Sequence, residues 1–312
     1  QYRLYGASEA AKYGGVAALV RSIASYSLYS PHTGSMHYED GIPQIPTAAI
    51  TVEDAEMLAR MQGRGNKIIL TLNMQAQTVE PVTSYNILAE VTGATFPDEV
   101  VVLGGHSDSW DVGQGAMDDG AGLFSAWQAV SLINRLVQTN QIPRPKRTIR
   151  LVLWVDEELS QRGAQTYFQD HIHELHQHVI AMESDSGNFD PVGFGFTGVP
   201  DAYDTLKLIS SVLLAPYGMG QVEYPDDGTS TDNEPLVDCG VPGANLWSTG
   251  FDPEDNDPKT AVYFYYHHSN ADTMTSLNYD GVYRSVASFS IMSYVLADMD
   301  EKLPNNITCS GL

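Results

Sequence analysis

Short apolar runs alternate with longer amphipathic stretches from near Ser84 to the end of the chain. Short apolar runs predict buried strands, whereas apolar residues at helical spacing predict helices that cover a sheet. This alternation favours an α/β fold with a largely parallel sheet. We expect strands at 86–91, 99–103, 147–155, 178–182 and 241–246, and helices at 120–137, 204–214 and 280–299.

The first 78 residues also alternate between helical and strand patterns, but they carry no recognisable catalytic motif. Thr51 is a suitable N-cap, and the acidic Glu53 and Asp54 suit the first turn of a helix. A segment rich in Ser, Tyr, Gly and Pro predicts a long loop. The expected elements are helices at 7–23 and 51–61, strands at 48–52 and 67–72, and a loop at 25–46.

The charge balance excludes one broad class of partner. The 312 residues include 39 acidic and 16 basic side chains, for a net charge of -23. Nucleic-acid binding needs a basic surface, so no nucleic-acid partner is expected. A hydrophobic content of 43% is typical of a soluble globular protein. No apolar run reaches the length of about 18 residues that predicts a membrane span.

Three local features bear on how the chain is processed. Cys239 and Cys309 are the two cysteines, and both a disulfide and two free thiols are compatible with that number. A sequon at Asn306 would accept a glycan in a secreted protein. The chain begins at Gln1, with neither a Met nor a signal peptide, which indicates a processed or truncated product.

Histidines and carboxylates gather just after predicted strands. An open α/β sheet binds its ligand beyond the carboxyl ends of its strands, so we expect these side chains to lie close together. The positions are His106 with Asp108, Asp118 with Asp119, Glu157 with Glu158, Glu183 with Asp185, and His267 with His268.

Two histidines and three carboxylates from this set would suit a pair of zinc ions. Zinc binds imidazole and carboxylate at about 2.0–2.2 Å, and one bridging carboxylate can hold two ions about 3.5–4 Å apart. The adjacent Glu157 and Glu158 cannot both easily reach one metal. One is expected to ligate while the other takes a proton from a metal-bound water. Each motif alone is more often structural, so the prediction rests on their joint occurrence.

Several longer segments resemble the co-catalytic zinc exopeptidase family, which includes bacterial aminopeptidases and glutamate carboxypeptidases. The resemblance covers nearly the whole chain. It implies a three-layer zinc-exopeptidase domain with a mostly parallel central sheet at 79–312, and a partial protease-associated lid domain at 1–78. It also implies a secreted or lysosomal homodimer that cleaves dipeptides with free ends. The segments are SPHTG at 30–34, ITVEDAEM at 50–57, DSWDVGQGAMDDG at 108–120, MESD at 182–185 and HHS at 267–269.

The resemblance implies two Zn2+ per chain and a ligand for each position around them. His106 and Asp185 would hold one zinc, and Glu158 and His268 would hold the other. Asp118 would bridge both ions, and the peptide bond that follows it would be cis. The family's histidine stands directly before a Ser or Thr, which selects His268 from the adjacent pair of histidines.

Two further roles follow from the resemblance. Glu157 would be the general base and then the general acid, and Asp108 would orient His106. The family also has a long segment before this start, so a separate N-terminal piece of the same precursor is a possible partner.

Three other functions fit parts of the pattern. A non-enzymatic receptor ectodomain on this fold would lack the zinc ligands, whereas the full set is present here. A single-zinc acyl-transfer enzyme, such as a glutaminyl cyclase, would not need the bridging Asp118. An aminopeptidase acting on longer peptides differs only in specificity. The segments 224–232 and 247–259 are expected to line the substrate pocket.

Overall fold

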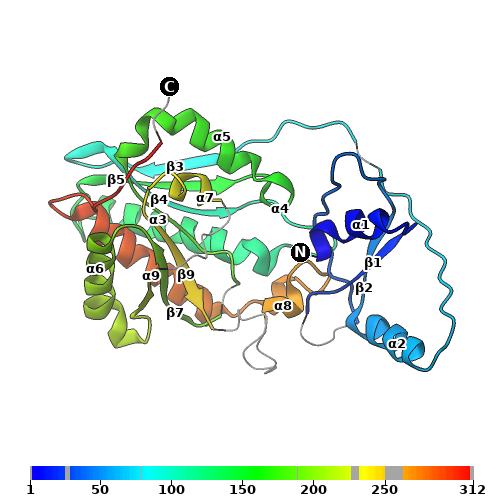
Figure 1. Cartoon of the computed structure of the whole chain (residues 1–312). Helices are drawn as coiled ribbons and strands as arrows, with labels where there is room; N and C mark the ends of the chain where they lie inside the picture. The colour runs from blue at the N-terminus through cyan, green and yellow to red at the C-terminus, as the bar shows by residue number, and fades with distance from the viewer. Residues whose placement is uncertain are drawn as a thin grey trace.

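The computed structural model describes residues 2–24, 29–77, 79–187, 189–225, 232–249 and 263–309. Each of its two parts is built around its own sheet (Figure 1). The smaller part contains two parallel strands, β1 (Ala18–Arg21) and β2 (Thr47–Ile50). The larger part contains a seven-stranded sheet with the order β3-β5-β4-β6-β9-β7-β8.

The seven-stranded sheet is mostly parallel, as the sequence predicts. β4 pairs in parallel with β5 and β6, β6 pairs in parallel with β9, and β7 pairs in parallel with β8. Only the β3–β5 and β7–β9 pairings are antiparallel among the described strands. The bounds are β3 Ile87–Val91, β4 Phe96–His106, β5 Arg147–Trp154, β6 His178–Glu183, β7 Pro191–Thr197, β8 Gln221–Glu223 and β9 Gly243–Ser248.

Helices cover both faces of this sheet and connect its strands (Figure 1). The α-helices are α1 Tyr2–Lys12, α2 Val52–Gly63, α3 Ala121–Gln138, α4 Glu157–Ser160, α5 Arg162–His171, α6 Pro200–Ile209, α7 Glu234–Val237, α8 Tyr263–Tyr266 and α9 Tyr279–Asp298. The shorter π and 3-10 turns are η1 Ala116–Gly120, η2 Ile172–Gln177, η3 Ser210–Leu214, η4 Ala215–Tyr217 and η5 Met274–Ser276.

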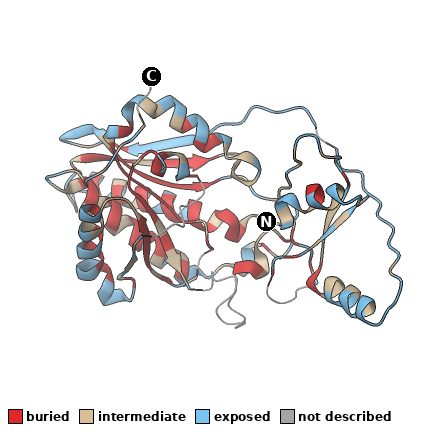
Figure 2. Cartoon of the chain, in the orientation of Figure 1, coloured by how far each residue is buried: buried red, intermediate tan, exposed pale blue. Residues whose placement is uncertain are grey.

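Alternate residues of the central strands face opposite helix layers. Val101 and Leu103 of β4 pack in the core that includes residues of α3, α6 and α9. Val100 and Val102 pack in a second core with residues of α5, η2 and α7. Successive side chains of a strand point to opposite faces, so one continuous apolar run serves both cores. Figure 2 shows the buried residues concentrated in this sheet and its helices. The predicted three-layer α/β arrangement is confirmed.

The smaller part departs from the sequence-based expectation in two places. α1 ends at Lys12 and β1 follows, where a single helix at 7–23 was expected. The expected helix is wrong because Gly14 takes a φ of +81°, a conformation that commonly ends helices. The expected strand at 67–72 is also wrong. This segment has no strand partner among the described residues, and its Ile69 is 77% exposed.

Other local predictions hold with small changes. The Thr51 side chain caps α2 by accepting a hydrogen bond from the Asp54 amide at 3.0 Å. The helix expected at 204–214 starts earlier, at Pro200, and its last turn is the π turn η3. The sequence pattern gave no indication of β7 and β8. β7 contains two glycines, which weaken the strand signal, and β8 has three residues.

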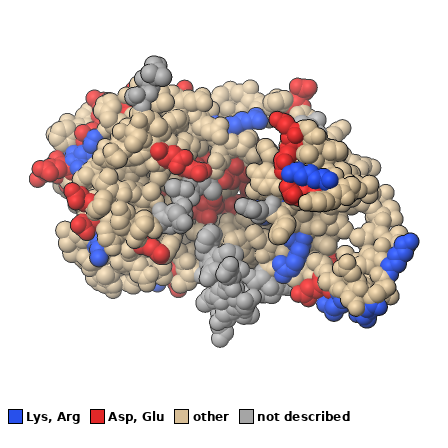
Figure 3. All heavy atoms as spheres, in the orientation of Figure 1, with Lys and Arg blue, Asp and Glu red and all other residues tan. Residues whose placement is uncertain are grey.

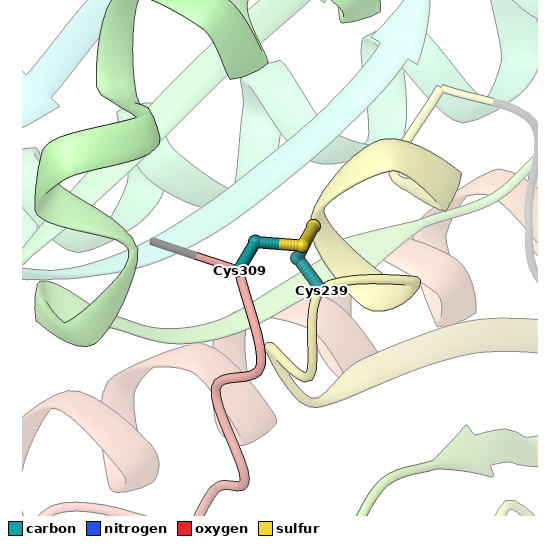
Figure 4. Close-up of a disulfide and its surroundings, with 2 residues drawn as sticks. All are labelled: Cys239 and Cys309. Carbon is teal, nitrogen blue, oxygen red and sulfur yellow. A yellow bond between two sulfur atoms is a disulfide. The ribbon is translucent and has the colours of Figure 1, made fainter. Parts of the chain in front are cut away.

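Cys239 and Cys309 form a disulfide, with 5.1 Å between their Cα atoms (Figure 4). The bond ties the segment after α9 to the end of α7. A backbone hydrogen bond of 2.9 Å from the Thr308 amide to the Cys239 carbonyl lies beside it. Among the described residues, no helix is both long enough and apolar enough to cross a membrane.

Candidate active site

The carboxyl ends of the central strands bring the candidate ligands to one place. His106 is the last residue of β4, Glu158 lies in α4 just after β5, and Asp185 follows β6 by two residues. Asp118 comes from η1, and His268 follows α8. A cavity of about 400 Å³ lies beside this group and is lined by both parts of the molecule. Figure 3 shows acidic side chains in the hollow at the centre of this face.

Asp118 stands between two imidazoles. Its Oδ1 lies 3.3 Å from Nε2 of His106, and its Oδ2 lies 3.2 Å from Nε2 of His268. The His106 ring also lies 3.6 Å from Oδ1 of Asp185. The His268 ring lies 3.0 Å from Oε2 of Glu158. The structure therefore brings together all five residues expected to bind metal, with Asp118 shared between two clusters.

The far side of each imidazole fixes its tautomer. Nδ1 of His106 lies 2.9 Å from the backbone oxygen of Asp108, and Nδ1 of His268 lies 3.1 Å from that of Thr33. A carbonyl oxygen only accepts hydrogen bonds, so each Nδ1 carries the hydrogen. In its neutral form each ring then presents the lone pair of Nε2 to the carboxylate oxygens, which are also acceptors. Facing acceptors of this kind are stabilised by a cation between them.

Buried polar atoms support the same interpretation. Among the described residues, no hydrogen bond satisfies Nε2 of His106, Oδ2 of Asp118 or Oε1 of Glu158, although all three atoms are buried. Such atoms normally have partners. Two groups of side chains could hold an ion, with ligand atoms within 4.8 Å of one another in each: His106, Asp118 and Asp185, and Asp118, His267 and His268. Imidazole and carboxylate donors of this kind fit zinc.

Both adjacent histidines lie next to Asp118. The rings of His267 and His268 stack with centroids 3.6 Å apart. Nε2 of His267 lies 3.6 Å from Oδ2 of Asp118, slightly farther than that of His268. His268 also contacts Glu158, and its backbone φ is +58°, a conformation that is uncommon outside glycine and often found at functional sites.

Asp108 holds the turn that carries the two adjacent glutamates. Its carboxylate accepts hydrogen bonds from the amides of Glu157 at 3.1 Å and Glu158 at 3.3 Å. The contact that orients His106 comes from the backbone oxygen of Asp108, while the carboxylate lies 3.9 Å from the ring. Oε2 of Glu157 lies 3.9 Å from Nε2 of His106, at the edge of the cluster.

Burial and charge shift the pKa values within the cluster. Burial raises the pKa of Glu157 to about 8, and the negative charge of Asp185 adds to the shift. Burial also opposes ionisation of Asp118, but the neighbouring imidazoles of His106 and His268 outweigh it and hold its pKa well below the usual range. A bound cation would pull carboxylate pKa values downward again. A carboxylate that takes up a proton near neutral pH suits a general base.

Two carboxylates without a predicted role also support the site. Asp119 accepts a hydrogen bond from the His106 amide at 3.2 Å, and the peptide bond between Asp118 and Asp119 is cis, as expected. A Cβ at Gly105 would lie 2.5 Å from Oδ2 of Asp119, so this close approach requires glycine. Asp272 accepts hydrogen bonds from the Asp118 amide at 3.3 Å and from the preceding amide at 2.7 Å.

A partial signal for these two residues was present in the sequence, because both are acidic neighbours of the recognised motifs. It did not indicate that they bind backbone amides. The segments 224–232 and 247–259 were expected to line the substrate pocket. Within them, 226–231 and 250–259 lie outside the described residues.

Comparison with known proteins places the chain in a family. The sequence profile described as Peptidase family M28 matches residues 86–290, which is more than half of the chain. The chain therefore belongs to peptidase family M28.

Individual relatives agree with this assignment. The chain is 47% identical over 306 residues to mouse carboxypeptidase Q, covering 98% of this chain and 61% of the mouse protein. It thus spans about three fifths of that relative's length. The crystal structure of a Peptidase M28 precursor from Shewanella amazonensis matches with a TM-score of 0.86 and 34% identity, covering 98% of this chain and 65% of that one.

A more distant structure shares the fold. The zinc aminopeptidase BSAP from Bacillus subtilis matches with a TM-score of 0.62 and 18% identity, covering 97% of this chain and 71% of that one. At this identity the match supports the fold alone.

Proposed function

We propose that the chain is a two-zinc exopeptidase that hydrolyses dipeptides or short peptides with free termini. The observation that carries the proposal is a pair of imidazoles that each place Nδ1 on a backbone oxygen and Nε2 against a shared carboxylate. When bound, the zinc ions would polarise the scissile carbonyl and lower the pKa of the attacking water. The ligands would be His106 and Asp185 for one ion, Glu158 and His268 for the other, and Asp118 for both.

The remaining residues position the reactants and move the proton. The Glu157 carboxylate takes a proton from the attacking water and later donates it to the leaving amine nitrogen. Asp108 fixes the amides of Glu157 and Glu158, and so holds the base beside a ligand. Its backbone oxygen sets the tautomer of His106. Membership of a peptidase family supports this reaction class.

The roles of the two parts belong to the same proposal. Residues 79–312 would form the peptidase domain, and residues 1–78 would be part of a protease-associated lid. The separate two-stranded sheet supports this division. The backbone hydrogen bond of 2.8 Å from the Thr33 amide to the His268 carbonyl supports the role of the smaller part as a lid.

A secreted or lysosomal location is part of the proposal as well. Disulfides persist in oxidising compartments, and the Cys239–Cys309 bond fits such a compartment. The sequon at Asn306 would then be available to a glycan. The homodimer and the preceding precursor segment rest on the family resemblance alone.

The proposal is tested by metal content and hydrolysis measured on one preparation. Protein purified without chelator should contain two zinc ions per chain and release amino acids from simple dipeptides, and a chelator should stop the release. A folded protein that binds no zinc and cleaves nothing would favour the receptor-like alternative. A single zinc ion would favour acyl transfer, and cleavage of longer peptides only would favour an aminopeptidase.

A further inference from the structure

The cavity beside the candidate metal ligands carries one strong positive charge. Arg3 of α1, in the smaller part, lines this cavity and is its only Lys or Arg among the described lining residues. The acidic lining residues all come from the larger part: Asp118, Glu157, Glu158 and Asp185. A substrate in this cavity therefore meets negative charge on one side and a guanidinium on the other.

A single residue ties Arg3 to the candidate metal site. The backbone oxygen of Thr33 accepts a long hydrogen bond of 3.5 Å from Nη1 of Arg3 and contacts Nδ1 of His268 at 3.1 Å. The Thr33 amide also donates to the His268 carbonyl at 2.8 Å. The guanidinium thus has a defined position relative to the side chain of His268, although the two residues come from different parts of the molecule.

The glycine that follows Thr33 makes room for the guanidinium. A Cβ on Gly34 would lie 2.7 Å from Nε and 2.9 Å from Cζ of Arg3. Both distances are shorter than van der Waals contact, so any larger residue here would displace the arginine side chain. The SPHTG segment at 30–34 therefore has a physical purpose that the metal site alone does not explain.

Arg3 lacks a carboxylate partner in the described structure. No described Asp or Glu forms an ion pair with it within 4.0 Å. Burial lowers its pKa, and the charges of Glu158 and Asp118 oppose that shift from a distance. A guanidinium presents a fork of donors that matches the two oxygens of a carboxylate. A partly buried guanidinium without such a partner is well suited to bind one from a ligand.

We propose that Arg3 binds the free C-terminal carboxylate of the substrate and so selects short peptides with an unblocked C-terminus. The inference rests on the proposed function, because it requires the scissile bond to lie beside the candidate metal ligands. A cavity of about 400 Å³ suits a small ligand. Neighbouring Cα atoms are only about 3.8 Å apart, so a carboxylate held in this same cavity lies within a residue or two of the scissile bond.

The test measures binding without turnover. In the zinc-loaded Glu157→Gln variant, calorimetry would compare glycyl-leucine with glycyl-leucinamide, which lacks the carboxylate charge. Adding Arg3→Gln should weaken binding of the free acid about 10- to 100-fold and change binding of the amide by less than about threefold. Arg60→Gln is the matched control, since it removes the same charge from an exposed position on α2 that does not line the cavity.

A second variant changes the position of the Arg3 side chain and keeps its charge. Gly34→Ala should displace the guanidinium and lower affinity for the free acid while leaving affinity for the amide unchanged. Zinc content and melting temperature, measured on every variant, separate misfolding from lost recognition. Equal loss for both ligands, or no loss for either, would overturn the role of Arg3. If neither peptide binds even with Arg3 intact, the proposed function fails instead.

Discussion

The larger and the smaller part of the molecule differ in the kind of residue that each of them buries. The larger part buries two extensive apolar cores, one on each face of its sheet. In the described residues of 2–77, by contrast, the buried apolar side chains are Ala7, Ala24, Ile45 and Val52. Five polar residues are buried in that same stretch: Ser8, Ser22, Ser30, His32 and Thr51. Figure 2 shows the contrast, with buried residues sparse in the smaller part.

This difference indicates that the two parts have different roles in the candidate active site. Catalytic groups must be held rigidly to be effective, and the larger part supplies the candidate ligands from the ends of well-packed strands. The smaller part contributes Arg3 to the cavity beside those ligands, and the backbone oxygen of its Thr33 contacts His268. We therefore expect substitutions in the larger part to affect chemistry and stability, and those around Arg3 to affect substrate choice.

The largest expected effect is at the residue shared by both clusters. Asp118→Ala removes the carboxylate that lies 3.3 Å from one imidazole and 3.2 Å from the other. Both zinc ions should be lost, and with them all measurable hydrolysis. Elemental analysis of the purified variant checks this directly. If the variant still holds two ions per chain, Asp118 is not the bridge, and the larger part does not depend on one shared ligand.

The next effect separates catalysis from metal binding. Glu157→Gln keeps the shape of the side chain but cannot take up the proton, so kcat should fall by about 10²- to 10⁴-fold with both zinc ions retained. Steady-state kinetics and zinc content, measured together, test the assignment. Asp156→Asn is a suitable control, because it neutralises the adjacent carboxylate, which does not line the 400 Å³ cavity. Near-normal kcat in Glu157→Gln would mean that another group carries the proton.

The sequence was most informative where structure follows from local pattern. Central strands such as β4 and β5 were predicted because burial on both faces gives a continuous apolar run. The ligands at their ends followed from the same reasoning, since parallel strands end at one edge of the sheet. The strands of the smaller part have only four residues each; β2 was expected at 48–52, whereas β1 was missed because the turn at Gly14 ends the helix before it.

The contacts that join the two parts could not be predicted from the sequence pattern. Thr33 and His268 are 235 residues apart, and nothing local to either residue indicates that they meet. The same holds for Arg3, whose environment depends on how the smaller part sits against the larger one. Asp272 is similar, because it binds amides from 154 and 155 residues away. Such contacts depend on tertiary packing, and the periodic patterns of a single sequence indicate only local structure.

A moderate effect is expected from the covalent link in the larger part. Replacing Cys239 and Cys309 with serine opens a bond between residues 70 apart in sequence. Cross-links over loops of this size typically contribute about 2–5 kcal/mol to the free energy of unfolding. Denaturant unfolding should show this loss, while zinc content and the preference for free acids stay unchanged. A change in that preference would show that the two parts are more tightly coupled than the comparison implies.

The smallest effect concerns acid stability and a buried histidine. His178, at the start of β6, is 1% exposed and lies 3.0 Å from the Tyr167 hydroxyl. Burial lowers its pKa to about 4, helped by the charge of Arg150, whereas an unfolded histidine titrates near about 6.5. Between these values the unfolded chain binds a proton that the folded chain excludes, so stability falls as the pH falls. The contribution is about 2 kcal/mol between about pH 7 and pH 5.

The test is the slope of the free energy of unfolding against pH, not its absolute value. His178→Gln also removes the Tyr167 contact, so it should be less stable at neutral pH but lose about 2 kcal/mol less on acidification. The same change at the exposed His173 should leave the slope as it is. His32 is the counterpart in the smaller part, since burial lowers its pKa to about 4 as well. Replacing His32 as well should therefore reduce the slope further. An unchanged slope in His178→Gln would show that His178 does not carry this acid sensitivity.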